Sequence, residues 1–221
     1  MVSFDVCIFD VNGVLLDSNA ANALAMGRAF TEDPVLRERV ARRYLQLTGI
    51  DRGKKIRIIQ EEIVGRPFEE GEFECRWEGF KVHGRLSMLQ APLGAGSIEV
   101  LTELGKRNIR RAALSNTPLK ELMETLEAHD LTRFLDIIRG GGDWPKSESL
   151  RRLLDEFSLS PGKCLFLGDG KGDLAAARSN GVPFVAIDAG RGEFHGEEGF
   201  DGPFENLAHW GRRNLGIVER S

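Results

Sequence analysis

Short apolar segments that end in polar or glycine-rich turns recur along the chain, and they constrain its fold more than any other feature. These segments are 4–9, 109–114, 134–142, 164–168 and 184–187. Segments with apolar residues at three-to-four spacing separate the later ones; they are 98–107, 119–130, 149–157 and 174–181. Short β-prone runs that alternate with helices of this length indicate parallel β-α-β units. We therefore predict an α/β fold with a doubly wound parallel sheet.

A second domain is predicted between the first two strands. The region 17–90 contains no such short apolar run and instead mixes apolar residues at helical spacing with many charges. It reads as a block of helices inserted directly after the first strand. We therefore assign residues 1–16 and 91–221 to the sheet domain, residues 17–90 to a helical domain, and residues 189–202, rich in glycine, to a surface loop.

Composition excludes several classes of protein. Hydrophobic residues make up 41% and charged residues 29% of the chain, as in ordinary globular proteins. Thirty basic and 34 acidic side chains give a net charge of −4, so a nucleic-acid partner is not expected. No run approaches the roughly 20 apolar residues of a membrane span, and acidic Asp5 stands where a secretory signal carries basic residues. We expect a cytoplasmic protein with no membrane partner.

The three cysteines are widely separated and form no metal-binding or disulfide pattern. They are Cys7, Cys75 and Cys164. Because no two of them have the short spacing of a metal-binding or redox pair, we predict reduced and buried thiols.

Polar side chains at the ends of the predicted strands form the candidate site. They are Asp10, Asn12, Ser115, Asn116, Lys146, Asp169 and Asp173. Ligands of open parallel sheets bind at the carboxyl ends of the strands, so we expect these side chains to converge. Carboxylates that converge repel one another unless a cation is present, and hard oxygen ligands favour Mg²⁺. A lysine and a hydroxyl beside them suit the remaining oxygens of a phosphate, so the set predicts phosphoryl transfer.

Four of these segments resemble the motifs of a known superfamily. Residues 9–15, FDVNGVL, resemble the first motif of the haloacid dehalogenase-like hydrolases, and 114–116, LSN, the second. Lys146 matches the motif lysine, and 168–173, GDGKGD, resembles the acidic motif. The four occur in the family's order across nearly the whole chain, and the inserted helices resemble a C1-type cap of the phosphatases in this superfamily.

The resemblance implies a role for each site residue. Asp10 is expected to be the nucleophile that forms an aspartyl-phosphate, and Lys146 to balance its charge. Mg²⁺ is expected to be held by Asp10, the backbone carbonyl of Asn12 and Asp169, with Asp173 supporting the metal through water. Ser115 and the backbone around Asn116 are expected to bind the phosphoryl oxygens. In the cap, the basic segment 48–55 resembles the substrate-specificity loop, so Arg52 and Lys54 become candidate substrate-binding residues. A small phosphorylated metabolite is the implied substrate, and the protein is expected to be a monomer or a homodimer.

Asn12 departs from the family pattern. The family has an aspartate here that protonates the leaving oxygen and then activates water, and a carboxamide does neither. General acid–base catalysis contributes about 10²–10⁴-fold to rate, so hydrolysis should be slowed by that order. Four hypotheses follow: a slow phosphatase, a protein that only binds a phosphate ester or holds a phosphoryl group, a phosphonate C–P hydrolase with a cap lysine such as Lys54 or Lys55 as Schiff base, or an introduced substitution that stalls the reaction.

Overall fold

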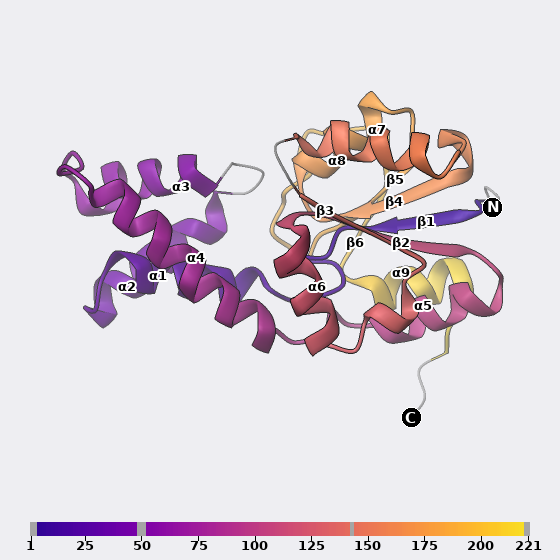
Figure 1. The fold of residues 1–221 in the computed structure, drawn as a ribbon, viewed down its shortest axis with the longest axis horizontal. Helices are drawn as coiled ribbons and strands as arrows, with labels where there is room; N and C mark the ends of the chain where they lie inside the picture. The colour runs from indigo at the N-terminus through magenta and orange to yellow at the C-terminus, as the bar shows by residue number, and fades with distance from the viewer. Residues whose placement is uncertain (1–3, 48–51, 142–143, 219–221) are drawn as a thin grey trace. The chain divides into compact units, whose positions relative to one another are not determined.

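The computed structural model describes residues 4–47, 52–141 and 144–218. Within them lies a six-stranded parallel sheet of order β3-β2-β1-β4-β5-β6 (Figure 1). The strands are β1 Val6–Phe9, β2 Arg110–Pro118, β3 Ile137–Gly141, β4 Cys164–Gly168, β5 Phe184–Ile187 and β6 Asp201–Phe204. The predicted α/β fold with a doubly wound parallel sheet is confirmed.

The chain divides into two compact units, Met1–Asp17 with Leu93–Ser221 and Ser18–Pro92, which we call the core unit and the helical unit. In the core unit, α7 and α8 cover one face of the sheet, and α5, α6 and α9 cover the other (Figure 1). The core-unit helices are α5 Ser97–Lys106, α6 Leu119–Ala128, α7 Lys146–Glu156, α8 Lys171–Ser179 and α9 Leu207–Leu215, with 3-10 turns at Thr132–Phe134 and Pro161–Lys163.

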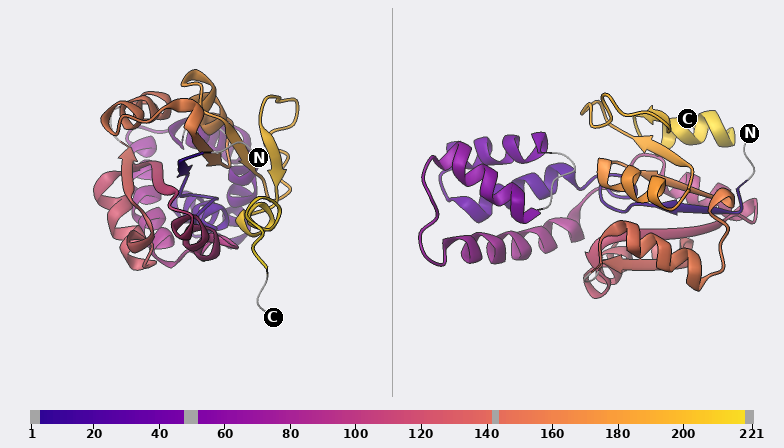
Figure 2. Two further views of the ribbon diagram at one scale, coloured as in Figure 1. Left: turned by 90° about the vertical axis from the view of Figure 1, so that its right-hand side faces the viewer. Right: turned by 90° about the horizontal axis from the view of Figure 1, so that it is seen from above.

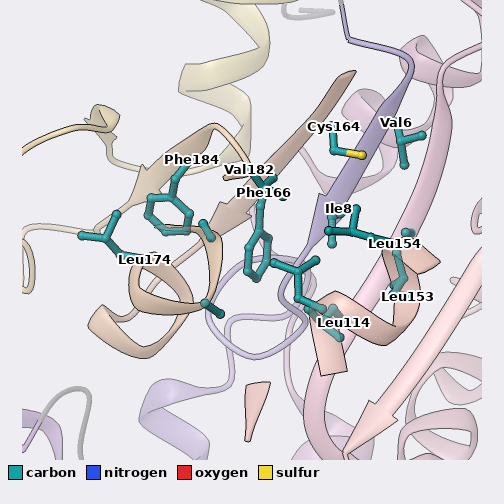
Figure 3. Close-up of a cluster of buried hydrophobic side chains, with 14 of the residues drawn as sticks. Val6, Ile8, Leu114, Leu153, Leu154, Cys164, Phe166, Leu174, Val182 and Phe184 are labelled. Atoms are coloured by element: carbon teal, nitrogen blue, oxygen red, sulfur yellow. The ribbon is translucent and has the colours of Figure 1, made fainter. Parts of the chain in front are cut away.

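The central strand β1 is buried along its whole length. All four of its residues are apolar and inaccessible, because parallel strands covered by helices on both faces have no solvent side. One face of β1 packs into a cluster with β4, β5, α7 and α8 that includes Ile8, Leu153, Phe166 and Phe184 (Figure 3). The rings of Phe166 and Phe184 meet edge to face, 5.7 Å between centroids. This packing fixes the end of β1, where the candidate site begins.

The helical unit has its own hydrophobic core. Its helices are α1 Asn19–Phe30, α2 Pro34–Gln46, α3 Arg52–Ile59, a π-helical turn Gln60–Val64, and α4 Glu72–Gln90. Met26, Tyr44, Ile59 and Phe80 are among the residues buried where these helices pack. In the described residues, no helix is both long enough and apolar enough to cross a membrane.

Two sequence predictions are wrong. Part of the expected surface loop 189–202 is structured, because Asp201 begins edge strand β6, which pairs with β5 (Figure 2), and Glu193 and Phe194 are buried. The Gly-Pro pair in β6 removes the usual strand signal, and an edge is where a sheet tolerates proline. Cys7 and Cys164 are buried as expected, but Cys75 is exposed because it lies on the solvent face of α4.

Candidate active site

Asp10 follows the central strand at the point where the strand order reverses. Its backbone N–H donates to Leu167 O of β4 at 2.9 Å, which continues the sheet by one residue. The chain then turns back through Gly13, whose φ of 84° suits glycine, and Gly13 N–H donates to Leu16 O at 2.7 Å. Asp10 therefore lies at the carboxyl end of the sheet between β1 and β4, the position at which open α/β sheets bind ligands.

Three carboxylates meet at this end of the sheet. Asp10, Asp169 and Asp173 each present an oxygen within 4.8 Å of the others, although the first and the last are 163 positions apart in the chain. Asp169 directly follows β4, and Asp173 lies in the first turn of α8. These are hard, anionic oxygen donors, so the cluster fits a divalent cation such as Mg²⁺ better than a soft metal.

Lys146 joins the carboxylates. It is the first residue of α7, is buried, and its Nζ lies 2.8 Å from Asp10 Oδ1 and also donates to Asp173 Oδ1. Burial alone would lower the pKa of Lys146, but the charges of Asp10 and Asp173 outweigh it, so the pKa is raised above its ordinary value. Lys146 therefore stays charged and partly neutralises the cluster.

Asp10 has a strongly altered pKa. Burial raises its pKa from the ordinary 3.8 to about 7; Lys146 opposes the shift, and the negative charges of Asp173 and Asp169 support it. Burial and the two neighbouring carboxylates therefore outweigh the effect of Lys146 on the pKa of Asp10. A cation bound beside these carboxylates favours the ionised form of Asp10.

Asp173 serves the helix and the site at once. Its Oδ2 accepts hydrogen bonds from the backbone N–H groups of Asp169, at 3.2 Å, and Gly170, at 3.1 Å, while its Oδ1 faces Lys146. An acid in the first turn of a helix is a common stabilising feature. In Asp173, the oxygen that accepts from the backbone at the start of α8 is therefore different from the oxygen that faces Lys146.

The end of β2 lies beside the loop that follows β1. Ser115 is buried and its Oγ accepts a hydrogen bond from Thr117 N–H at 3.1 Å, whereas Asn116 is exposed. Asn12 Nδ2 is 3.4 Å from Thr117 Oγ1, a long hydrogen bond. Thr117 was not among the residues predicted from the sequence, although it follows Ser115 and Asn116 directly at the same strand end.

Arg52 and Lys54 belong to the helical unit. The Arg52 guanidinium lies 5.6 Å from the centroid of the Phe80 ring, and Lys54 is exposed. Their role in substrate binding stays a prediction, and residues 48–51 of the basic segment lie outside the described residues.

The segment after β5 holds two neighbours of the acidic cluster that were not predicted from the sequence. Arg191 Nη2 donates to Asp169 Oδ2 at 3.0 Å, and buried Glu193 accepts from Lys171 N–H at 3.0 Å. Both follow Asp188 at the end of an apolar strand, which is the signal that located Asp10 and Asp169. Reading 189–202 as a surface loop hid them.

The fold and the site together define the class: an α/β enzyme with an acidic site at the carboxyl edge of a parallel sheet. The sequence profile of the family described as haloacid dehalogenase-like hydrolase matches residues 7–187. The chain belongs to this family of hydrolases, as its motifs predicted.

Relatives with assigned activities are similar along most of the chain. A phosphoglycolate phosphatase of Pasteurella multocida is 27% identical over 203 residues, covering 86% of this chain and 88% of the relative. A phosphorylated carbohydrates phosphatase of Thermotoga maritima is 25% identical, covering 80% and 82%. The solved structure of a CbbY mutant from Rhodobacter sphaeroides in complex with xylulose-(1,5)bisphosphate matches with a TM-score of 0.72 at 19% identity, covering 94% of this chain and 96% of that chain.

Asp10→Asn should stabilise the metal-free fold above neutral pH. Because the pKa of Asp10 is raised, its contribution to stability is fully present below 3.8 and is lost as pH rises through about 7. A neutral carboxamide avoids that loss, so we expect a gain of about 1–3 kcal/mol at pH 8 and almost none at pH 4. Urea unfolding of both proteins in EDTA measures the difference. A variant less stable than wild type at pH 8 would contradict the described charge balance.

Proposed function

We propose that the protein is a Mg²⁺-dependent phosphatase that hydrolyses a small phosphate monoester through an aspartyl-phosphate on Asp10. One observation carries the proposal: buried Asp10 lies at the switch point of the sheet, 2.8 Å from Lys146 and grouped with two further carboxylates. Membership of a hydrolase family and similarity to named phosphatases support it.

Asp10, Asp169, Asp173 and the backbone carbonyl of Asn12 are the proposed metal-binding groups. The three carboxylates provide the oxygen donors that Mg²⁺ prefers. When bound, the cation supplies charge neutralisation for the phosphoryl group as it is transferred.

In the proposed reaction, an Asp10 oxygen attacks phosphorus while the ester P–O bond breaks and its electron pair stays on the leaving oxygen. Lys146, already paired with Asp10, balances the charge of nucleophile and phosphate. Ser115 Oγ and the backbone at Asn116 bind phosphoryl oxygens. Water then attacks phosphorus, the bond to Asp10 breaks, and inorganic phosphate leaves with the Asp10 carboxylate restored.

Asn12 limits this reaction at both steps. Its carboxamide cannot give a proton to the leaving oxygen and cannot take one from water, so solvent must do both. The proposed enzyme is therefore slow. The same observation favours a second candidate function, a protein that binds a phosphate ester with little turnover.

The helical unit is the proposed cap and source of specificity. Arg52 and Lys54 bring positive charge that suits a second anionic group on the substrate. Phosphoglycolate and phosphorylated carbohydrates, the substrates in the names of the relatives, carry such groups or several hydroxyls. A phosphonate hydrolase is less well supported, because neither candidate lysine has the burial that turns a lysine into a Schiff-base nucleophile. Lys54 is exposed, and half-buried Lys55 has its Nζ 4.1 Å from the centroid of the Tyr44 ring.

Metal removal should strongly reduce turnover. We expect phosphate release from at least one member of a panel of aryl phosphates, sugar phosphates and phosphoglycolate in Mg²⁺, with a loss of about 10²–10³-fold in EDTA and recovery when Mg²⁺ is returned. Malachite green detection of phosphate measures it. No release from any member in Mg²⁺, while a panel ester still raises the thermal midpoint of unfolding, would establish the binding protein instead.

A further inference from the structure

We propose that Arg191 is a positioning residue that holds Asp169 in the orientation required for metal binding. The inference rests on the proposed function, because it concerns the proposed metal ligand. Arg191 lies 22 residues after Asp169, in the segment that follows β5, and no motif of the sequence analysis includes it.

The contact itself restricts Asp169. Arg191 Nη2 donates to Asp169 Oδ2 at 3.0 Å and lies 3.2 Å from the backbone oxygen of the same residue. One guanidinium nitrogen thus ties a side chain to its own main chain, which limits rotation of the carboxylate. The pair is largely shielded, with 22% of the Arg191 side chain and 13% of the Asp169 side chain exposed.

Arg191 is itself held in place. Buried Asp188 accepts hydrogen bonds from the backbone N–H groups of Arg191, at 2.7 Å, and Glu193, at 2.8 Å. Glu193 in turn accepts from Lys171 N–H at the start of α8, at 3.0 Å. The segment 188–193 is therefore fastened at one end to β5 and at the other to the acidic motif, with Arg191 between the two fixed points.

Removing Arg191 should change metal binding in opposite directions, depending on whether Arg191 acts through its charge or by orienting Asp169. A guanidinium repels a metal ion, so if it acted only through charge, removing it would strengthen metal binding. If it acts by orienting the ligand, removing it weakens metal binding, as loss of a hydrogen-bond partner of a ligating group usually does, by about 10–100-fold. Because Arg191 Nη2 contacts both the side-chain and the backbone oxygen of Asp169, we expect the effect on orientation to be larger than the effect of charge.

Calorimetric titration of Mg²⁺ into the EDTA-stripped full-length protein tests this. We expect the Kd to rise about tenfold or more in Arg191→Met and by a smaller factor in Arg191→Lys, which keeps the charge but loses the rigid planar group. At saturating Mg²⁺, kcat should stay within about threefold of wild type while the Mg²⁺ half-saturation shifts. A residue needed only for folding would lower the unfolding midpoint and leave the Kd unchanged.

Two controls separate the outcomes. Arg178→Met removes an exposed guanidinium of α8 that pairs with Glu197 at 2.8 Å, and it should leave the Kd within about twofold of wild type. Asp169→Asn should abolish or strongly weaken binding. If wild type binds Mg²⁺ and Asp169→Asn does not, but both Arg191 variants bind as tightly as wild type or tighter, the role of Arg191 is overturned and the metal site stands. If wild type itself does not bind, both proposals fall.

Discussion

Asp10→Asn should reduce phosphate release by about 10⁴–10⁶-fold, the scale seen when an enzyme loses its nucleophile. The substitution keeps the shape of the side chain and removes the oxygen that forms the bond to phosphorus. Lys146 retains Asp173 as a partner, so the fold is expected to persist. Steady-state kcat/KM on the best substrate of the panel measures the loss.

The Asp10 experiment has a matched control beside the same strand. Asp5→Asn removes an exposed carboxylate directly before β1, whereas Asp10 directly follows it, and should leave kcat/KM unchanged. Repeating both substitutions in an Asn12→Asp background widens the measurable range if wild type is slow. Retention of more than a tenth of the activity in Asp10→Asn would exclude an aspartyl-phosphate on this residue.

Asn12→Asp should increase kcat by about 10²–10⁴-fold, the usual contribution of general acid–base catalysis. The new carboxyl group supplies the proton for the leaving oxygen and then accepts one from water. The local contact survives the change, because the Thr117 hydroxyl, which accepts from Asn12 Nδ2 at 3.4 Å, can donate to a carboxylate instead. The backbone carbonyl at position 12 is the same in both proteins.

Asn12→Ala shows whether a gain in kcat in Asn12→Asp comes from the added carboxyl group or from the loss of the amide. It removes the carboxamide without adding a titratable group, so its kcat should stay at or below that of wild type. A gain confined to Asn12→Asp shows that the rest of the site is competent and lacks only the proton shuttle. Equal rates in wild type and Asn12→Asp, with ester binding retained, would indicate that the natural function is binding.

Local sequence patterns were sufficient for most of the fold. The run 4–9 contains β1, and helical spacing in 119–130 and 149–157 located α6 and α7 to within a few residues. The spacing of apolar residues shows which side of a helix or strand is buried, and this spacing can be read from residues that are neighbours in the sequence. The edge strand β6 escaped because its Asp-Gly-Pro-Phe sequence has little strand propensity and is ordered by pairing with β5.

The site residues that follow the ends of strands could be predicted from the sequence. Asp10, Lys146, Asp169 and Asp173 were all named from the sequence, and the structure brings them together. Arg191 was missed because residues 189–202 were taken as a surface loop, although they follow Asp188 at a strand end. Its pairing with Asp169, 22 residues away, depends on how the chain packs and not on local spacing.

The sequence by itself determined the element types, the alternation that makes the sheet parallel, and the acidic, basic and hydroxyl groups at its edge, because all of these depend on residue identity and short spacing. Only the tertiary structure decided that Lys146 bridges Asp10 and Asp173, that Arg191 donates a hydrogen bond to Asp169, and that burial raises the pKa of Asp10 to about 7. Strand order and helix packing set distances between residues far apart in the chain. The local dielectric around a charge is likewise a collective property of everything packed against it.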